Sequence, residues 1–232
     1  MYERSYEAFH RIERERLRLE QRKGMEYDIF ANISTREQTG NKGGFFRMAE
    51  CRRALEAIDR QGWERSYHQK QFHEDFIRAS ARVFWKTESA GQFQRDHQHI
   101  LEWNGWDHLA QEILVSTPRR FGKTISVSMF GAAVIFSAPS IQMSIYSTCK
   151  RISQKILENV YMFLRLIYKE LGISPMRELR RNMEQMILQG PEGENDRRVI
   201  NSYPSRVCYN SLSRSLFAVF RRSTLACSST VS

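Results

Sequence analysis

The stretch that most constrains the fold is a short apolar run that ends in a polar turn and leads directly into a helical pattern. The run and turn read Glu112-Ile-Leu-Val-Ser-Thr-Pro-Arg-Arg-Phe-Gly-Lys-Thr124, and small and apolar residues continue over 125–136. Strand, loop and helix amino end, in this order, bind phosphate groups, because the free amides and the helix dipole attract negative charge. Gly122, Lys123 and Thr124 provide the Gly-Lys-Thr of a phosphate-binding loop, so the sequence predicts a nucleotide site at this turn.

The loop departs from the usual G-x-x-x-x-G-K-[ST] pattern at its first position, where Thr117 replaces glycine. Lys123 would reach the β and γ phosphates and Thr124 would hold Mg²⁺, so ATP and Mg²⁺ are the predicted cofactors. The alternative is a surface turn before a helix, which the order of strand, loop and helix disfavours. The predicted nucleotide-binding loop consists of Thr117, Pro118, Arg119, Arg120, Phe121, Gly122, Lys123 and Thr124.

The segment Thr-Pro-Arg-Arg-Phe-Gly-Lys-Thr at 117–124 resembles the phosphate loop of large terminase subunits, the DNA-packaging motors of herpesviruses and tailed phages. Loops of that family place an arginine where other phosphate loops are rich in glycine, and Arg119 occupies this position. The resemblance implies that Arg119 acts in catalysis together with Lys123 by stabilising the γ-phosphate, since a fixed guanidinium neutralises charge on phosphate oxygens. It extends over residues 92–207 and is most specific at 118–124.

The residues after the loop predict a repeating α/β unit. Segment 140–147 alternates polar and apolar side chains like a strand, and 149–164 has the apolar spacing of an amphipathic helix. This order predicts a parallel sheet flanked by helices, the α/β fold of RecA-like P-loop NTPases, incomplete here and preceded by a helical region. Lys150, Arg151 and Lys155 on the second helix are candidates for contacts with DNA phosphates, and a solvated basic face is the alternative.

A glutamine ahead of the first strand is a further candidate for the nucleotide site. Terminases and helicases commonly carry one at this distance, where its amide pairs with the adenine edge. Gln98 fits best, because Ile100, Leu101 and Trp103 behind it suit a packed helix. The alternative is an ordinary exposed residue of a helix.

An active ATPase of this class also needs an apolar strand that ends in paired acids, which hold the metal-bound water and activate the attacking water. Segment 185–204 predicts a strand, a polar turn and a second strand, the part that precedes those acids. No aspartate or glutamate follows Asp196. We therefore expect a motor domain truncated before its acidic motif, with a shifted reading frame or misplaced gene end near Val207. A genuine basic tail that binds nucleic acid is the alternative.

The remainder of the chain divides by composition. Residues 2–23 are dense in Glu and Arg, as in a solvent-exposed helix, and two more helices are predicted at 45–59 and 67–86. The tail is rich in serine and free of acids, which predicts disorder. The predicted segments are a charged helical arm at 1–44, a helical region at 45–110, a partial P-loop ATPase core at 111–207 and a disordered Ser/Arg-rich tail at 208–232.

The composition bounds the class of protein. A net charge of +10 over 232 residues favours a polyanionic partner such as DNA. We expect no membrane span and no secretory signal. The four cysteines have no paired spacing, which favours free thiols in a reducing compartment. Asp96, His97 and His99, and likewise His68 and His73, lack the context of a zinc site, and we interpret them as ordinary surface or packed residues.

The resemblance therefore implies the ATPase motor domain of a terminase large subunit, which couples ATP hydrolysis to the packaging of viral DNA into capsids. It also implies double-stranded viral DNA, a portal and a small terminase subunit as partners, a homo-oligomeric ring, and an intracellular place of action in the host nucleus or cytoplasm. Two alternatives stay open: a helicase-like DNA-dependent ATPase, and a non-catalytic fragment that binds nucleotide or nucleic acid.

Overall fold

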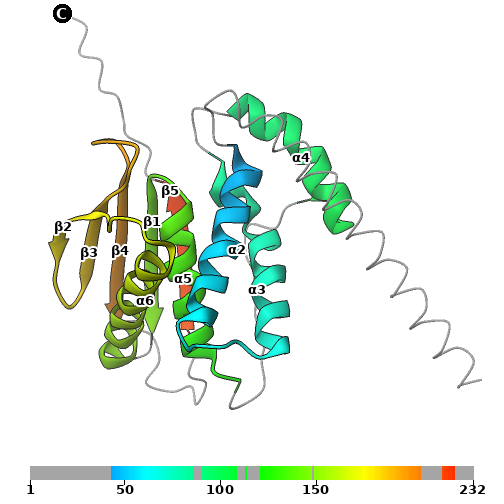
Figure 1. Ribbon diagram of the computed structural model, residues 1–232. Helices are drawn as coiled ribbons and strands as arrows, with labels where there is room; N and C mark the ends of the chain where they lie inside the picture. Colours follow the sequence, from blue (N-terminus) through cyan, green and yellow to red (C-terminus); the bar gives the residue numbers. More distant parts are fainter. Residues whose placement is uncertain are drawn as a thin grey trace, which may run out of the picture.

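The computed structural model combines a mixed sheet with a layer of helices (Figure 1). Helices α5 and α6 cover one face of the sheet, and α2 packs against both from the outer side. Helices α3 and α4 lie farther from the sheet, beside α2. The structure describes residues 43–85, 90–108, 113, 121–147, 149–204 and 216–222.

The sheet has five strands in the order β2-β3-β4-β1-β5. The prediction of a parallel sheet is wrong for most of it, because β1 and β4 are the parallel pair and the other pairings are antiparallel. A short turn joins β3 to β4 and can connect only antiparallel strands, whereas helix α6 lies between β1 and β4 in the chain and permits a crossover. The strands are β1 (Ile141–Ser147), β2 (Arg177–Arg181), β3 (Gln185–Gln189), β4 (Arg197–Pro204) and β5 (Leu216–Arg222).

Most of the observed helices match those predicted from the apolar periodicity of the sequence. The helix predicted at 67–86 is shorter than expected, since α3 ends at Ala79, where the Ser80 hydroxyl donates to the Phe76 carbonyl at 2.6 Å and a 3₁₀ turn follows. The predicted strand at 140–147, the helices at 45–59 and 149–164 and the hairpin at 185–204 are confirmed. The helical elements are α2 (Gly44–Arg60), α3 (Tyr67–Ala79), η2 (Ala81–Phe84), α4 (Ala90–Asn104), α5 (Lys123–Ser137) and α6 (Lys150–Leu171).

The predicted arm and the predicted tail are described only in part. The charged arm at 1–44 lies almost wholly outside the described residues. The prediction that the tail is disordered does not hold for Leu216–Arg222, which forms β5 beside β1. No helix within the described ranges is long and apolar enough to cross a lipid bilayer.

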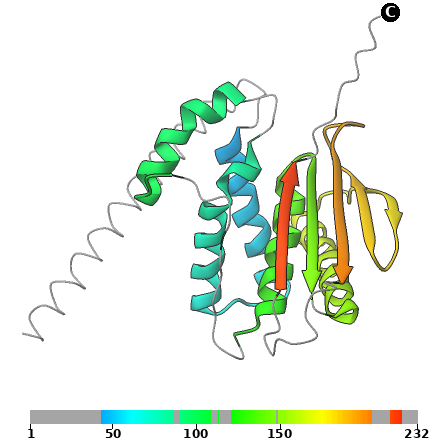
Figure 2. The same ribbon diagram turned by 180° about the vertical axis from the view of Figure 1, so that it is seen from behind.

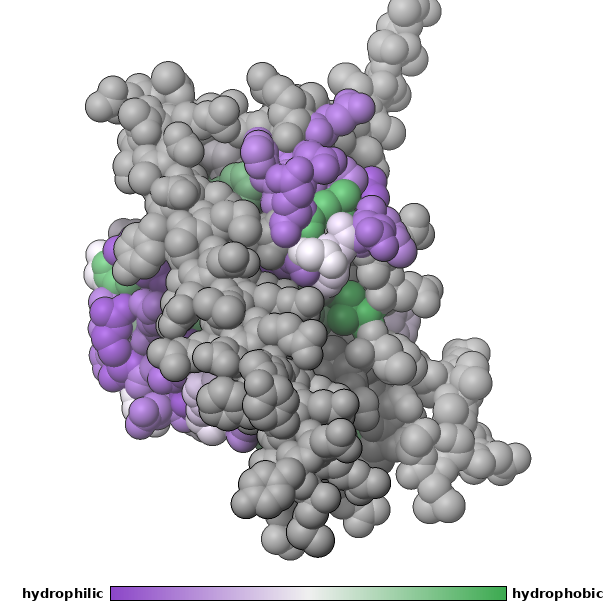
Figure 3. Space-filling model, turned by 90° about the vertical axis from the view of Figure 1, so that its right-hand side faces the viewer, coloured by the Kyte–Doolittle hydropathy of each residue, from purple (hydrophilic) through white to green (hydrophobic). Residues whose placement is uncertain are grey.

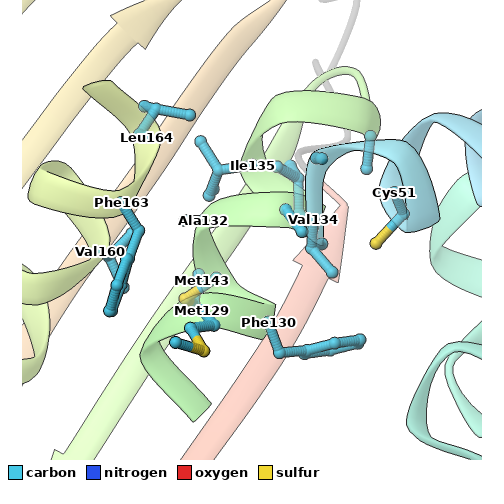
Figure 4. Packing of buried hydrophobic residues seen from close by; sticks show 14 of the residues in the cluster. Cys51, Met129, Phe130, Ala132, Val134, Ile135, Met143, Val160, Phe163 and Leu164 are labelled. Atoms are coloured by element: carbon cyan, nitrogen blue, oxygen red, sulfur yellow. The ribbon is translucent and has the colours of Figure 1, made fainter. Parts of the chain in front are cut away.

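Helix α5 forms the centre of the core (Figure 4). It packs against α6 and the sheet on one side and against α2 on the other, which explains why its sequence is apolar on almost every face. Gly131 allows a close approach, since a Cβ atom there would lie 3.2 Å from Val160 and 3.3 Å from Met143. The outer side of the helical layer is different: where Figure 3 colours it, hydrophilic side chains predominate, with small hydrophobic patches between them.

A buried ion pair joins the carboxyl end of α5 to the sheet. Arg198 donates to the carbonyls of Ile135 and Phe136, each at 2.6 Å, and to Asp196 at 2.9 and 3.2 Å. Asp196 also accepts the Ser140 amide at 2.8 Å. Burial by itself raises the pKa of Asp196, but the bonds and charge of Arg198 and the backbone amides outweigh it, so the pKa is lowered.

We expect Arg198→Met to lower the free energy of unfolding by about 3–5 kcal/mol, because it leaves the buried Asp196 carboxylate without its partner. Urea unfolding followed by circular dichroism measures this difference. Arg197→Met is the matched control, since Arg197 is exposed on the same strand and its loss should change stability by less than about 0.5 kcal/mol. Equal effects of the two substitutions would contradict the role of the buried pair.

Candidate nucleotide-binding site

The predicted phosphate loop leads into a glycine-capped helix amino end. Gly122 caps α5 with φ +81°, a left-handed conformation that favours glycine, and the helix begins at Lys123. Lys123 is exposed and Thr124 is half-buried. The first intrahelical bond runs from the Ser126 amide to the Gly122 carbonyl at 2.9 Å, so the amides before Ser126 have no acceptor within the helix. Among the described residues these amides have no other acceptor, which leaves them for an anion.

This helix end lies at the carboxyl edge of the parallel strands. A short turn connects α5 to β1, so the two run antiparallel, and the amino end of α5 comes beside the carboxyl end of β1. Helix α6 follows β1 and begins at the same edge, as Figures 1 and 2 show. In open α/β sheets ligands bind outside the carboxyl ends of the strands, where helix amino ends supply positive potential.

Helix α3 supports the first turn of α5 from the outer side. Gln69 donates through Nε2 to the Phe121 carbonyl at 3.0 Å, and Phe72 contacts the Phe121 ring edge to face at 5.9 Å. A Cβ atom at Gly122 would lie 3.1 Å from the Gln69 amide nitrogen, so a side chain there meets both crowding and backbone strain. Gln69 is itself placed by a capping box with Ser66 at the start of α3.

A buried histidine contacts the first turns of α5. His73 lies with Nε2 at 2.8 Å from the Ser126 carbonyl, and Arg65 donates to its Nδ1 at 3.1 Å. The neutral tautomer with a proton on Nε2 satisfies both contacts. Arg65 is held in turn by Asp59. Burial above all, together with the charge of Arg65, lowers the pKa of His73 to about 4, against opposing effects of Ser126 and Asp59.

The sequence interpretation of His73 as a packed residue is consistent with this arrangement. His68, its sequence neighbour in the zinc alternative, is exposed. Within the described part of the chain no group of His, Cys, Asp or Glu is arranged to hold a metal ion. The role of His73 in supporting α5 was not evident from the sequence, because the contact joins residues 53 positions apart and no local spacing marks it.

Most of the predicted loop before Phe121 is not described by the structure. Thr117, Pro118, Arg119 and Arg120 lie outside the described residues. Ile113, the one described position of the predicted first strand, is exposed and in no regular element. The structure therefore describes the helix end of the predicted loop.

Gln98 lies on α4, where it is exposed and donates to Glu102 at 3.0 Å. Asp96 on the same helix accepts the Trp85 indole at 3.0 Å, and Trp85 packs over Gly44 at the start of α2. Figures 1 and 2 show α4 toward the end of the helical layer where α2 begins, opposite the end where α5 begins. The structure does not bring Gln98 to the first turn of α5.

Lys150, Arg151 and Lys155 are all exposed on the first turns of α6, at the same edge as Lys123. Lys150 pairs with Glu184 at 2.5 Å and Lys155 with Glu158 at 3.5 Å. Such exposed pairs contribute little to stability and are readily exchanged for phosphate contacts. The three side chains thus remain accessible to a polyanion.

A pocket of about 330 Å³ lies between α6 and the hairpin of β2 and β3. The guanidinium of Arg181 covers the Tyr161 ring at 3.7 Å in its wall. None of the predicted site residues lines it.

Comparisons with protein families, with curated proteins and with solved structures return no match for this chain. The described geometry and the loop pattern are therefore the basis for inferring function.

The pH dependence of stability should reveal the neutral state of His73. Its pKa in the folded protein is about 4 against an ordinary 6.5, so the unfolded chain binds the proton first as pH falls. The stabilising contribution is complete above pH 6.5 and is lost between 6.5 and 4, by up to about 3 kcal/mol. Urea unfolding at pH 7, 5.5 and 4 measures the loss, and the His73→Gln variant should lack this component. A histidine resonance of His73 titrating near 6.5 would contradict it.

Proposed function

We propose that this chain is a nucleotide-binding ATPase region of the terminase type, which acts in the packaging of viral DNA. The observation that carries the proposal is the amino end of α5: a left-handed glycine, an exposed lysine and first-turn amides that have no acceptor among the described residues, at the carboxyl edge of β1 and β4. This arrangement supports phosphate binding independently of the loop pattern.

The roles of the residues follow from their positions. The backbone amides of the first turn would bind the phosphates, and the Lys123 ammonium would contact the β and γ oxygens. The Thr124 hydroxyl would hold Mg²⁺, whose charge would offset that of the phosphates. Arg119 would contact the γ-phosphate, as the terminase resemblance implies. Gln98 is left out of the proposed site because of its place on α4.

The extension to DNA packaging rests on charge and on the resemblance. The chain has a net charge of +10, and three basic side chains begin α6 beside the proposed phosphate site. Contacts between these side chains and the phosphates of double-stranded DNA would couple the nucleotide state to DNA. A portal, a small terminase subunit, a ring of copies and an intracellular place of action belong to the proposal through the resemblance.

A non-catalytic nucleotide-binding protein is the second candidate. It is favoured by one observation: no aspartate or glutamate follows Asp196, and Asp196 itself is buried with Arg198 at the carboxyl end of α5. Asp196 therefore belongs to a structural ion pair at the opposite end of α5 and does not lie at the phosphate edge. Without a carboxylate to orient the attacking water, nucleotide can bind without efficient turnover.

The Lys123→Ala variant should bind MgATP at least about tenfold more weakly than the unchanged chain, because a charge-assisted phosphate contact contributes about 1.5–3 kcal/mol. Fluorescence titration with a labelled ATP analogue measures the dissociation constant. The control is Lys169→Ala, which removes an exposed lysine from the other end of α6. Equal affinity of the two variants for MgATP would contradict a phosphate site at Lys123.

Hydrolysis should separate the two candidates. We expect the chain to turn over ATP no faster than its Lys123→Ala variant, since no aspartate or glutamate follows the buried Asp196, where this class of ATPase carries its acidic motif. Steady-state phosphate release measures this rate, with and without double-stranded DNA. Robust turnover that depends on Lys123 would show that a carboxylate elsewhere in the chain, or from a second copy, completes the site. Strand separation on a forked duplex would instead favour the helicase-like alternative.

A further inference from the structure

The face of the sheet opposite α5 and α6 carries no helix among the described elements (Figure 2). The strand register divides the side chains between the two faces. Met143 and Ile200 are neighbours on the helix face and are buried. Residues one position along each strand, beginning with Gln142 beside Val199, therefore point to the other side, which we call the open face.

Two stacked tyrosines stand at one end of the open face. Tyr146 on β1 and Tyr203 on β4 are direct neighbours in the parallel register. Their ring centroids are 5.3 Å apart with an angle of 23° between the planes, and the residues remain 38% and 42% exposed. Tyrosines usually bury most of their ring area in a core, so a half-exposed pair on a sheet offers a platform for another flat ring.

Three exposed arginines stand at the other end. Arg177 on β2 and Arg197 on β4 lie on either side of Gln189 on β3, so these two arginines and the glutamine form one row across the sheet. Arg180 lies in the next row beside Ile187. All three arginines are exposed. Arg181 points the other way, since its guanidinium covers Tyr161 of α6.

The open face of β1 to β4 has no carboxylate among its described side chains. Glu178 is in register with Leu188, which is buried against the helices, so it points to the opposite face. The centre of the open face consists of amide, hydroxyl and apolar side chains, of which Asn201 is buried and accepts a hydrogen bond from Gln185 at 2.8 Å, and the others are half-buried: Gln142, Ser144, Gln185, Ile187, Gln189 and Val199. The positive charge and the hydrogen-bonding side chains of the open face therefore complement a polyanion that carries aromatic bases.

We propose that this open face binds single-stranded nucleic acid, with unpaired bases stacked on Tyr146 and Tyr203 and the phosphate backbone bound by Arg177, Arg180 and Arg197. From Arg197 to Tyr203 along β4 the face extends about 20 Å, which accommodates several nucleotides. Aromatic rings on a sheet stack on bases only when the bases are free of a duplex, so single strands are preferred over paired ones. The arginine end of this surface lies away from the proposed phosphate site, whereas Tyr146 and Tyr203 stand near the ends of β1 and β4, at the carboxyl edge where α5 begins.

The experiment is a fluorescence anisotropy titration of the full chain with a labelled oligothymidine of about twelve nucleotides, a length within the usual footprint of such surfaces. An oligouridine and a duplex of equal length form the other arms. We expect both single strands to bind more tightly than the duplex. Tyr146→Leu and Tyr203→Leu should each weaken binding about tenfold, whereas the phenylalanine variants should retain it, because phenylalanine still stacks.

The arginines are tested by the salt dependence of the affinity. Replacing Arg177, Arg180 and Arg197 together by glutamine should lower the slope of log affinity against log salt by about 2, since each phosphate contact on a single strand contributes about 0.7. Arg53→Gln, which removes an exposed arginine from α2, is the control with unchanged slope expected. The Lys123→Ala variant should bind the oligonucleotide as tightly as the unchanged chain does. Loss of ATP binding in that variant would therefore not count against this proposal.

Two results would overturn the proposal. Unchanged affinity in the leucine variants, or equal losses in leucine and phenylalanine variants, would exclude stacking on the tyrosines. Tighter binding of the duplex with an unchanged slope in the triple arginine variant would place nucleic acid elsewhere, for example on the first turns of α6. Thermal unfolding of each variant shows whether it is folded, and if a leucine variant is not, the triple variant decides the outcome.

Discussion

The burial of α5 is the constraint on which the rest of the structure depends. This helix is enclosed by α6, the sheet and α2, and it packs so closely on Met143 and Val160 that a Cβ atom at position 131 would require these side chains to shift. A helix without a solvent face has almost no freedom to rotate or slide, because interiors are packed as tightly as organic crystals. The position of its amino end is therefore set by the core.

Buried polar side chains hold α5 at both ends. Arg198 binds carbonyls of the last turn, and the neutral His73 binds the carbonyl of Ser126 near the first. The carbonyls that Arg198 binds belong to the last turn, where helix carbonyls have no intrahelical donor, whereas His73 binds a carbonyl inside the helix. The two contacts differ in chemistry: the arginine brings its own counter-ion in Asp196, while the histidine stays uncharged and adds no net charge beneath the proposed phosphate site.

The two faces of the sheet serve different purposes in this arrangement. The helix face is apolar and makes the core, and its carboxyl edge carries the amino ends of α5 and α6. The open face is polar, aromatic and basic, and contributes little to the core. A chain that binds nucleotide at an edge and nucleic acid on a face would keep the two ligands on one rigid sheet, close enough for one to influence the other through β1 and β4.

The sequence alone determined the features that depend on neighbours along the chain. The apolar run of α5, the alternation of β1 and the 3.6-residue period of α6 follow from local spacing, and Gly122 marks the helix start because few other residues adopt a positive φ. Tertiary structure decided what depends on distant residues. The mixed direction of the sheet, the contact of His73 with α5 and the pairing of Tyr146 with Tyr203 all join positions far apart in the chain. Periodicity tells which side of an element is apolar, but only the packed chain determines which element that side meets.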